Sequence, residues 1–203
     1  MEKENNTLPK AVALYTFIDM ETDDKFGATP NTYSKDYSNP ITRHKILKRL
    51  IAYAIKHCYG VDIKEKNPMN YIENGRGYID GIYFSFSLCL RVVCVSVSNY
   101  PTGVSLQIPF PIYDELEYAE YNFCKNELEE YQKREFGEYT YYYLMCKKKA
   151  YQNKHGLKNE ENKTFDFTQG SYTCHTDTFS KGLYIFVATD DTKFEKIDVE
   201  VLL

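Results

Sequence analysis

The sequence predicts an α+β protein made of two similar halves, each a small antiparallel sheet with packed helices. Three observations predict this class. A chain of 203 residues can bury a core as one globular unit, or as two small halves that share an interface. Short β-rich runs are separated by longer helical stretches, in the order strand, helix, strands, and then strands, helices, strands. No tandem repeat of short period is present. We place the boundary between the halves at residues 1–74 and 75–203.

The N-terminal half is predicted to begin with a strand at residues 11–19, where β-formers cluster. Residues 21–40 are polar and are predicted to form a loop. A helix is expected at residues 42–59, followed by Gly60 as its stop. Its apolar side chains recur at helical spacing: Ile46, Leu47, Leu50, Ile51, Ala54, Ile55 and Cys58.

The middle of the chain is predicted to form a meander of strands. A short strand is expected near residues 69–72, and two longer ones at 82–87 and 91–98. In the last of these, Val93, Val95 and Val97 alternate with smaller or polar residues, which predicts two different faces. The residues 103–108 follow a turn and are expected to be the third strand of the meander.

The C-terminal part is predicted to contain two helices, at residues 115–136 and 138–155, with Gly156 ending the second. Strands are expected near residues 164–167, 171–175 and 183–189. The tail, residues 194–203, is expected to add an edge strand.

Composition bounds the function classes. The formal net charge of −4 argues against a nucleic-acid partner, because no basic excess exists to neutralise phosphates. The N-terminal residues 1–10 are charged and do not read as a signal peptide, and no apolar run is long enough for a membrane span. Six cysteines without a CxxC pair argue against a zinc site or disulfide framework. We therefore expect a soluble protein of the cytoplasm.

Four motifs occur in order along the chain. A Gly75-Arg76-Gly77 turn precedes the strand Phe84-Ser85-Phe86-Ser87-Leu88, and Gly103-Val104-Ser105-Leu106-Gln107 follows. Downstream, Met145-Cys146-Lys147-Lys148-Lys149-Ala150 is continued by Asn153 and Gly156. In spacing, these motifs resemble the 4′-phosphopantetheinyl transferase superfamily, in the surfactin-synthetase-activating form whose two halves are fused in one chain. The resemblance covers nearly the whole chain and implies that family's α+β fold, with the binding site in the cleft between the two halves and the metal and coenzyme A motifs in the C-terminal half.

The resemblance also implies a chemistry, and this chain departs from it. Family members use Mg²⁺ to transfer the phosphopantetheine arm of coenzyme A to a serine of an acyl or peptidyl carrier protein, and fused members tend to be monomers. The three family metal ligands are carboxylates, but their positions here are Ser105, Gln107 and Lys149. Mg²⁺ prefers hard oxygen ligands, so a magnesium site of the family type is not expected. Leu88 and Asn153 replace a family His and Lys that also serve the site.

Other positions keep the family's charge or residue type. Arg43, Arg76, Ser87 and Lys148 match family positions that bind coenzyme A, and Lys148 and Lys149 stand at the catalytic helix positions. Lys149 could replace the ion as a point charge on a pyrophosphate. An alternative interpretation is that Arg43 and residues 147–149 are solvated helix surface, and that Ser105 and Gln107 are plain strand residues.

Three functions remain open at this stage. The first is a degenerate family member, weak or inactive in transfer, that retains coenzyme A or carrier-protein binding. The second is a working transferase that uses Lys149 and recruits another carboxylate from the acidic segment 115–130. The third is an interaction protein with an empty cleft. The four histidines show no paired spacing for metal or general-base work, and GxSxG is absent.

Overall fold

The computed structural model describes residues 11–17, 40–89, 92–134, 138–158, 163–169, 184–190 and 194–198. The chain is α+β, as predicted. A six-stranded sheet has the order β2-β3-β4-β5-β1-β8, in which β8 (Phe194–Asp198) runs parallel to β1 (Ala11–Phe17) and the other neighbours are antiparallel. A second sheet pairs β6 (Thr102–Gln107) with β7 (Tyr184–Thr189). Among the described helices, none is long and apolar enough to cross a membrane.

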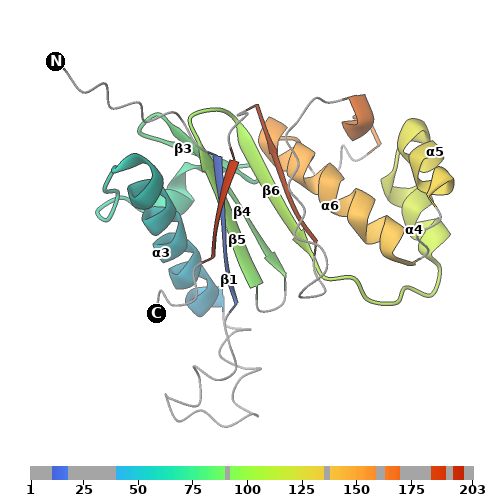
Figure 1. Ribbon diagram of the computed structural model, residues 1–203, viewed down its shortest axis with the longest axis horizontal. Helices are drawn as coiled ribbons and strands as arrows, with labels where there is room; N and C mark the ends of the chain where they lie inside the picture. The colour runs from blue at the N-terminus through green and yellow to red at the C-terminus, as the bar shows by residue number, and fades with distance from the viewer. Residues whose placement is uncertain are drawn as a thin grey trace, which may run out of the picture.

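The elements stack in layers, which Figure 1 shows from left to right: α3, the large sheet, the β6–β7 sheet, α6, and then α4 with α5. The helix α3 (Pro40–Tyr59) buries its predicted apolar stripe against the large sheet, where Leu50, Ile51, Ala54 and Ile55 are at most 1% exposed. Gly60 ends it with a positive φ of 70°, a conformation that favours glycine.

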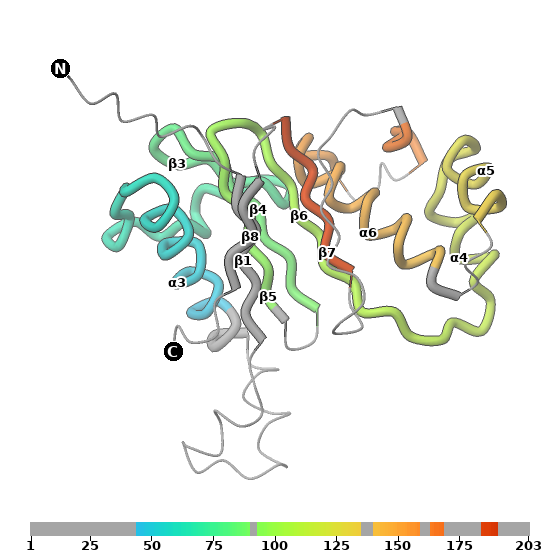
Figure 2. Tube along the Cα trace, in the orientation of Figure 1, coloured from blue at the N-terminus to red at the C-terminus, as the bar shows by residue number. Residues whose placement is uncertain are grey.

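The strand β5 (Val92–Ser98) has the two faces that its alternation predicts. Val93, Val95 and Val97 pack toward α3, whereas Cys94 packs against Val104, Leu106, Ile185 and Val187 of the second sheet. The third strand of the expected meander is wrongly placed. The strand β6 follows β5 along the chain but does not join the large sheet; it pairs with β7 in the second sheet (Figure 2).

Serine side chains connect the two sheets. The Ser85 and Ser87 hydroxyls on β4 (Ile82–Cys89) accept hydrogen bonds from the backbone N–H groups of Val104 at 3.3 Å and Leu106 at 3.0 Å. Ser85 also donates to the Gly75 carbonyl at 2.8 Å. These small polar residues let β6 lie close to β4 while its edge N–H groups remain hydrogen-bonded.

Two tight hairpins build the edge of the large sheet. The turn Asn74-Gly75 joins β2 (Ile72–Glu73) to β3 (Arg76–Ile79), and Asp80-Gly81 joins β3 to β4. All four turn residues have positive φ, as two-residue hairpins require. The strand β3 was not among the strands expected from the sequence. The strand predicted near 69–72 is largely wrong as well: residues Pro68–Tyr71 form the 3₁₀ helix η1, because Asn67 caps Met69 N–H and Pro68 starts the turn.

The C-terminal helices differ from the prediction at one point. The single helix expected at 115–136 is two helices, α4 (Glu115–Asn122) and α5 (Lys125–Lys133). The break occurs because Phe123 is buried and the Glu127 carboxylate accepts a hydrogen bond from the Cys124 backbone N–H at 3.0 Å, which starts a new helix. The helix α6 (Glu138–His155) has the predicted bounds, and Gly156 follows with a φ of 66°.

The remaining predictions have mixed outcomes. Residues 164–167 do not form a strand, and the 3₁₀ helix η3 (Phe167–Gln169) lies there instead. The strand predicted at 183–189 is confirmed as β7, and the edge strand of the tail is confirmed as β8. The strand expected at 171–175 lies outside the described residues.

Candidate functional site

The candidate site is built where β6 and α6 touch. A Cβ atom added to Gly103 would lie 2.1 Å from the Ala150 carbonyl oxygen and 2.2 Å from the Lys154 nitrogen, so only glycine allows this approach. Next to that contact, the Cys146 thiol donates to the Ser105 carbonyl at 3.2 Å and the Asn153 amide donates to the Val104 carbonyl at 2.9 Å. The helix is therefore held on the strand in one register.

Two of the three family metal positions lie on this strand. Val104 and Leu106 pack toward the large sheet, so the alternate residues Ser105 and Gln107 lie on the face toward α6. Ser105 is 2% exposed and Gln107 is half-buried.

The third position, Lys149, lies on the flank of the α6 face that contacts β6. It follows Cys146 by three residues and precedes Asn153 by four, and both of those side chains contact β6. Its half-buried side chain donates to the Gln152 amide oxygen at 3.1 Å. Burial, together with the neighbouring Lys148 charge, lowers the pKa of the Lys149 ammonium. The strand and helix carrying the three aligned positions are therefore neighbours.

These side chains do not fit Mg²⁺. A hydroxyl, a neutral amide and an ammonium offer no anionic ligand, and the ammonium would repel the ion. Their character favours an anion instead, because Lys149 contributes positive charge and the other two side chains can donate hydrogen bonds. We derive no metal-dependent step at this site.

The adjacent lysine has a different environment. Lys148 and Glu127 are both fully buried, and the Lys148 ammonium forms an ion pair with one Glu127 carboxylate oxygen. That same oxygen accepts from Cys124 N–H, and the other oxygen accepts from Phe167 N–H at 3.1 Å. The Lys148 ammonium also lies 4.6 Å from the centre of the Phe165 ring. Lys148 thus joins α6, α5 and η3 and points away from β6.

The only group of side chains with metal-ligand character, within the described part of the chain, surrounds this ion pair. Ligand atoms of Cys124, Glu127 and Asp166 lie within 4.8 Å of one another. Two of the three already have partners: Glu127 has those described above, and Asp166 accepts from Asn126 at 2.7 Å and from Thr168. Burial raises the pKa of the Cys124 thiol, which disfavours the thiolate that binds metal. The buried ammonium already supplies the positive charge that a metal would bring.

The residues predicted to bind coenzyme A have structural contacts. The Arg76 guanidinium donates to the Lys154 carbonyl at 3.1 Å near the C-terminus of α6, and Ser87 accepts from Leu106 N–H. Arg43 lies in the first turns of α3, and its side chain is outside the described residues. The side-chain nitrogen of Asn153 donates to the Val104 carbonyl of β6, and its side-chain oxygen lies close to Gly75. Leu88 packs partly buried in the core beneath α3.

The importance of two positions for the packing around the candidate site was not foreseen from the sequence. Glu127 belongs to the acidic segment 115–130, but its role as the partner of Lys148 required the fold to bring α5 and α6 together. Gly103 was recognised as part of a motif, and its Cβ-free contact with the α6 backbone gives the physical reason for glycine there. Neither the family models nor the curated proteins with which the chain was compared contain a match to this sequence.

Proposed function

We propose that the chain is a degenerate member of the 4′-phosphopantetheinyl transferase superfamily, inactive in Mg²⁺-dependent transfer, that binds coenzyme A without a metal. The observation that carries this proposal is the packing of β6 on α6, which brings the strand with Ser105 and Gln107 against the helix with Lys149. These are the positions at which the resemblance places the metal. The two pseudo-related halves implied by the resemblance, divided near residue 74, are part of the same proposal.

The charge of the site favours pyrophosphate as the bound group. Replacing three carboxylates and one divalent ion by two neutral groups and one ammonium changes the formal charge from about −1 to about +1. A half-buried ammonium interacts with a phosphate more strongly than an exposed one, because less solvent screens the pair. Lys149 would therefore supply the attraction that the ion supplies in the family.

The contacts of Lys148, Arg76 and Ser87 reduce the number of residues that are available to bind coenzyme A. Each of these side chains already hydrogen-bonds within the fold, so coenzyme A affinity should depend mainly on Lys149. A rearranged metal site is less favoured. Glu127, the carboxylate of segment 115–130 that meets the lysine run, is buried and paired on the side of α6 away from β6.

The proposal is tested by comparing binding with transfer. Coenzyme A should bind the wild-type chain, and Lys149→Glu should weaken it at least about tenfold. Lys64→Glu, which makes the same charge change at an exposed turn, should leave affinity within about twofold. An acyl carrier protein incubated with coenzyme A, Mg²⁺ and this chain should gain no mass, beside an active transferase as positive control.

Other outcomes overturn the proposal. A mass gain of one phosphopantetheine arm on the carrier would establish a working enzyme. An absence of coenzyme A binding would favour a scaffold used for protein contacts alone. Equal weakening by Lys149→Glu and Lys64→Glu would show that binding follows net charge and does not occur at this site.

A further inference from the structure

We propose that the α4–α5 end of the molecule is a docking surface for a basic polypeptide segment of a partner protein, anchored by one large apolar side chain. This inference does not rest on the function proposed above. The surface consists of the exposed side of α4 and the groove between α4, α5 and Lys163. In Figure 1 these two helices form one end of the molecule, separated from β6 by α6.

The groove can accept an apolar anchor. It has a volume of about 600 Å³ and is lined by Glu120, Phe123, Cys124, Lys125, Leu128, Glu129, Gln132 and Lys163. Its apolar members are the buried Phe123 and the half-buried Leu128 and Cys124, while charged side chains form much of the remaining lining. An apolar base with a polar surround is the usual anatomy of a peptide-binding groove.

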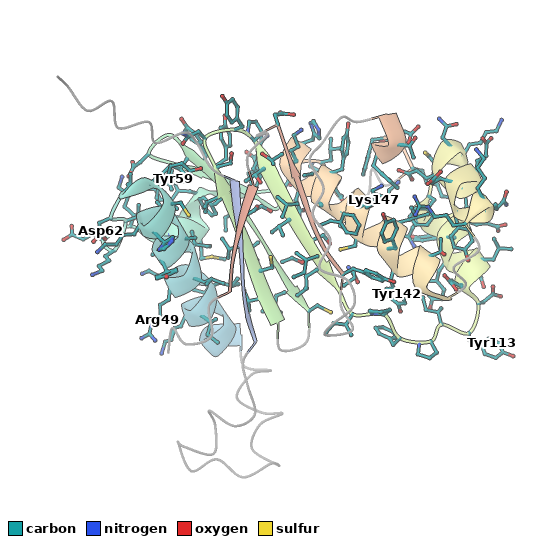
Figure 3. All side chains as sticks on the ribbon, in the orientation of Figure 1. Arg49, Tyr59, Asp62, Tyr113, Tyr142 and Lys147 are labelled. Carbon is teal, nitrogen blue, oxygen red and sulfur yellow. The ribbon has the colours of Figure 1, made fainter. Side chains whose placement is uncertain are left out.

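Exposed apolar side chains extend the surface beyond the groove. Leu116 is 47% exposed, Tyr118 is 52% exposed and Tyr121 is 75% exposed. The Lys163 ammonium lies 6.0 Å from the centre of the Tyr121 ring, so Tyr121 adjoins the groove. Just before α4, Tyr113 also projects from this end of the molecule (Figure 3). Exposed tyrosines next to a groove are typical of protein interfaces, where aromatic residues contribute much of the binding energy.

The negative charge on α4 indicates that the partner segment is basic. Between residues 112 and 124 the sequence contains Asp114, Glu115, Glu117 and Glu120 and no Lys, Arg or His. Asp114 caps the helix by accepting from Glu117 N–H, and Glu115 accepts from Tyr141 N–H at 3.0 Å. Those two carboxylates therefore have a structural role.

Other carboxylates on this surface have no such role. Glu117, Glu120 and Glu129 are exposed, and within the described ranges none of them forms an ion pair. The basic side chains Lys125 and Lys163 line the groove, whereas α4 contains no basic residue, so the negative excess lies on α4. A complementary segment would place its apolar anchor in the groove and its Lys or Arg side chains over α4.

The test uses two fluorescent amphipathic peptides of equal length, one of leucine and lysine and the other of leucine and glutamate. The lysine peptide should bind the wild-type chain at least about tenfold more tightly in fluorescence anisotropy, and added salt should weaken it. Glu117→Lys with Glu120→Lys should reduce its affinity at least about fivefold. The control, Glu65→Lys with Glu73→Lys, reverses two exposed carboxylates elsewhere and should change affinity less than about twofold.

A second measurement locates the peptide. Cys124 lines the groove and Cys58 lies half-buried in α3, so saturating lysine peptide should slow iodoacetamide alkylation of Cys124 and leave Cys58 unchanged. Equal binding of both peptides, equal loss in the two charge-reversal variants, or no protection of Cys124 would overturn the proposal. So would tighter binding of the glutamate peptide, the result expected for an acidic partner. Concentration-dependent self-association that is lost in Glu117→Lys with Glu120→Lys would assign the surface to a second copy of the chain instead.

Discussion

The two sides of α6 show how one run of like residues is used in different ways. Lys148 points toward α5 and is fully buried in an ion pair with Glu127, whereas Lys149 flanks the β6 side, is half-buried and contacts Gln152. Lys147, labelled in Figure 3, lies 5.6 Å from the Tyr143 ring centre and 5.7 Å from that of Phe167. The comparison indicates that Lys148 holds the helices together, while Lys149 is the lysine to which the proposed coenzyme A site assigns ligand binding.

The largest effect on stability is expected from a substitution on the side of α6 that faces α5. Lys148→Met should lower the free energy of unfolding by about 3–5 kcal/mol, because it leaves the Glu127 carboxylate buried without its cation. Urea denaturation followed by circular dichroism measures this change. The double variant Lys148→Met with Glu127→Gln should recover a large part of the loss, since no buried charge remains. A single variant that costs less than about 1 kcal/mol would mean that Glu127 is not dependent on Lys148.

The next largest effect on stability is expected at the contact between β6 and α6. Gly103→Ala should destabilise the protein by about 1–3 kcal/mol or more, because the new methyl group meets helix backbone that cannot move aside alone. Gly60→Ala is the matched comparison: it has a positive φ of 70° but no atom within 4 Å of the added Cβ. It should therefore show only the backbone cost of about 1 kcal/mol. A milder effect at Gly103 than at Gly60 in thermal denaturation would contradict the close β6–α6 contact.

A smaller effect is expected between the two sheets. Ser85→Ala removes a hydroxyl that accepts from Val104 N–H and donates to the Gly75 carbonyl, and should cost about 1–2 kcal/mol. Ser87→Ala removes one such bond at a half-buried position and should cost about half as much. Equilibrium unfolding of both variants tests the order, which would be refuted if Ser87→Ala were the more damaging change.

The smallest effect concerns pH at the C-terminal end of α6. Burial and the charges of Lys154 and Arg76 lower the pKa of His155 below its ordinary value of 6.5, although Asp190 opposes them. The folded state then binds fewer protons than the unfolded chain, so this stability is complete above pH 6.5 and is lost as the pH falls below it. His155→Gln should reduce the drop in melting temperature on going from neutral to mildly acidic buffer. An unchanged drop in His155→Gln would contradict the shift.

The elements that the sequence predicted well are those with a strong local period. The stripe of α3 and the alternation of β5 follow from residue spacing alone, whereas the end of α6 follows from the stop residue Gly156. The missed strand β3 had a usable signal, because Asn74-Gly75 and Asp80-Gly81 are the dipeptides that two-residue hairpins favour. The break between α4 and α5 was harder to foresee, since Cys124 is an unusual first cap and only the Glu127 side chain marks the new helix.

The placement of the aligned residues in the fold was more predictable than their environments. Motif spacing was enough to single out Ser105, Gln107 and Lys149, which the fold places on adjoining elements. Spacing could not tell that Lys148 would be buried, because its partner Glu127 is 21 residues away and meets it only through tertiary packing. Nor could it reveal that Ser87 and Arg76 would hydrogen-bond to backbone groups of β6 and α6, which depends on how the layers stack.

The measurement that tests the central claim most directly is a calorimetric titration of the chain with coenzyme A, run with and without Mg²⁺. A site built on Lys149 and lacking carboxylates predicts binding whose affinity is the same in both buffers within about twofold. Binding that strengthens markedly with Mg²⁺ would contradict the account, because it would mean that carboxylates elsewhere complete a metal site.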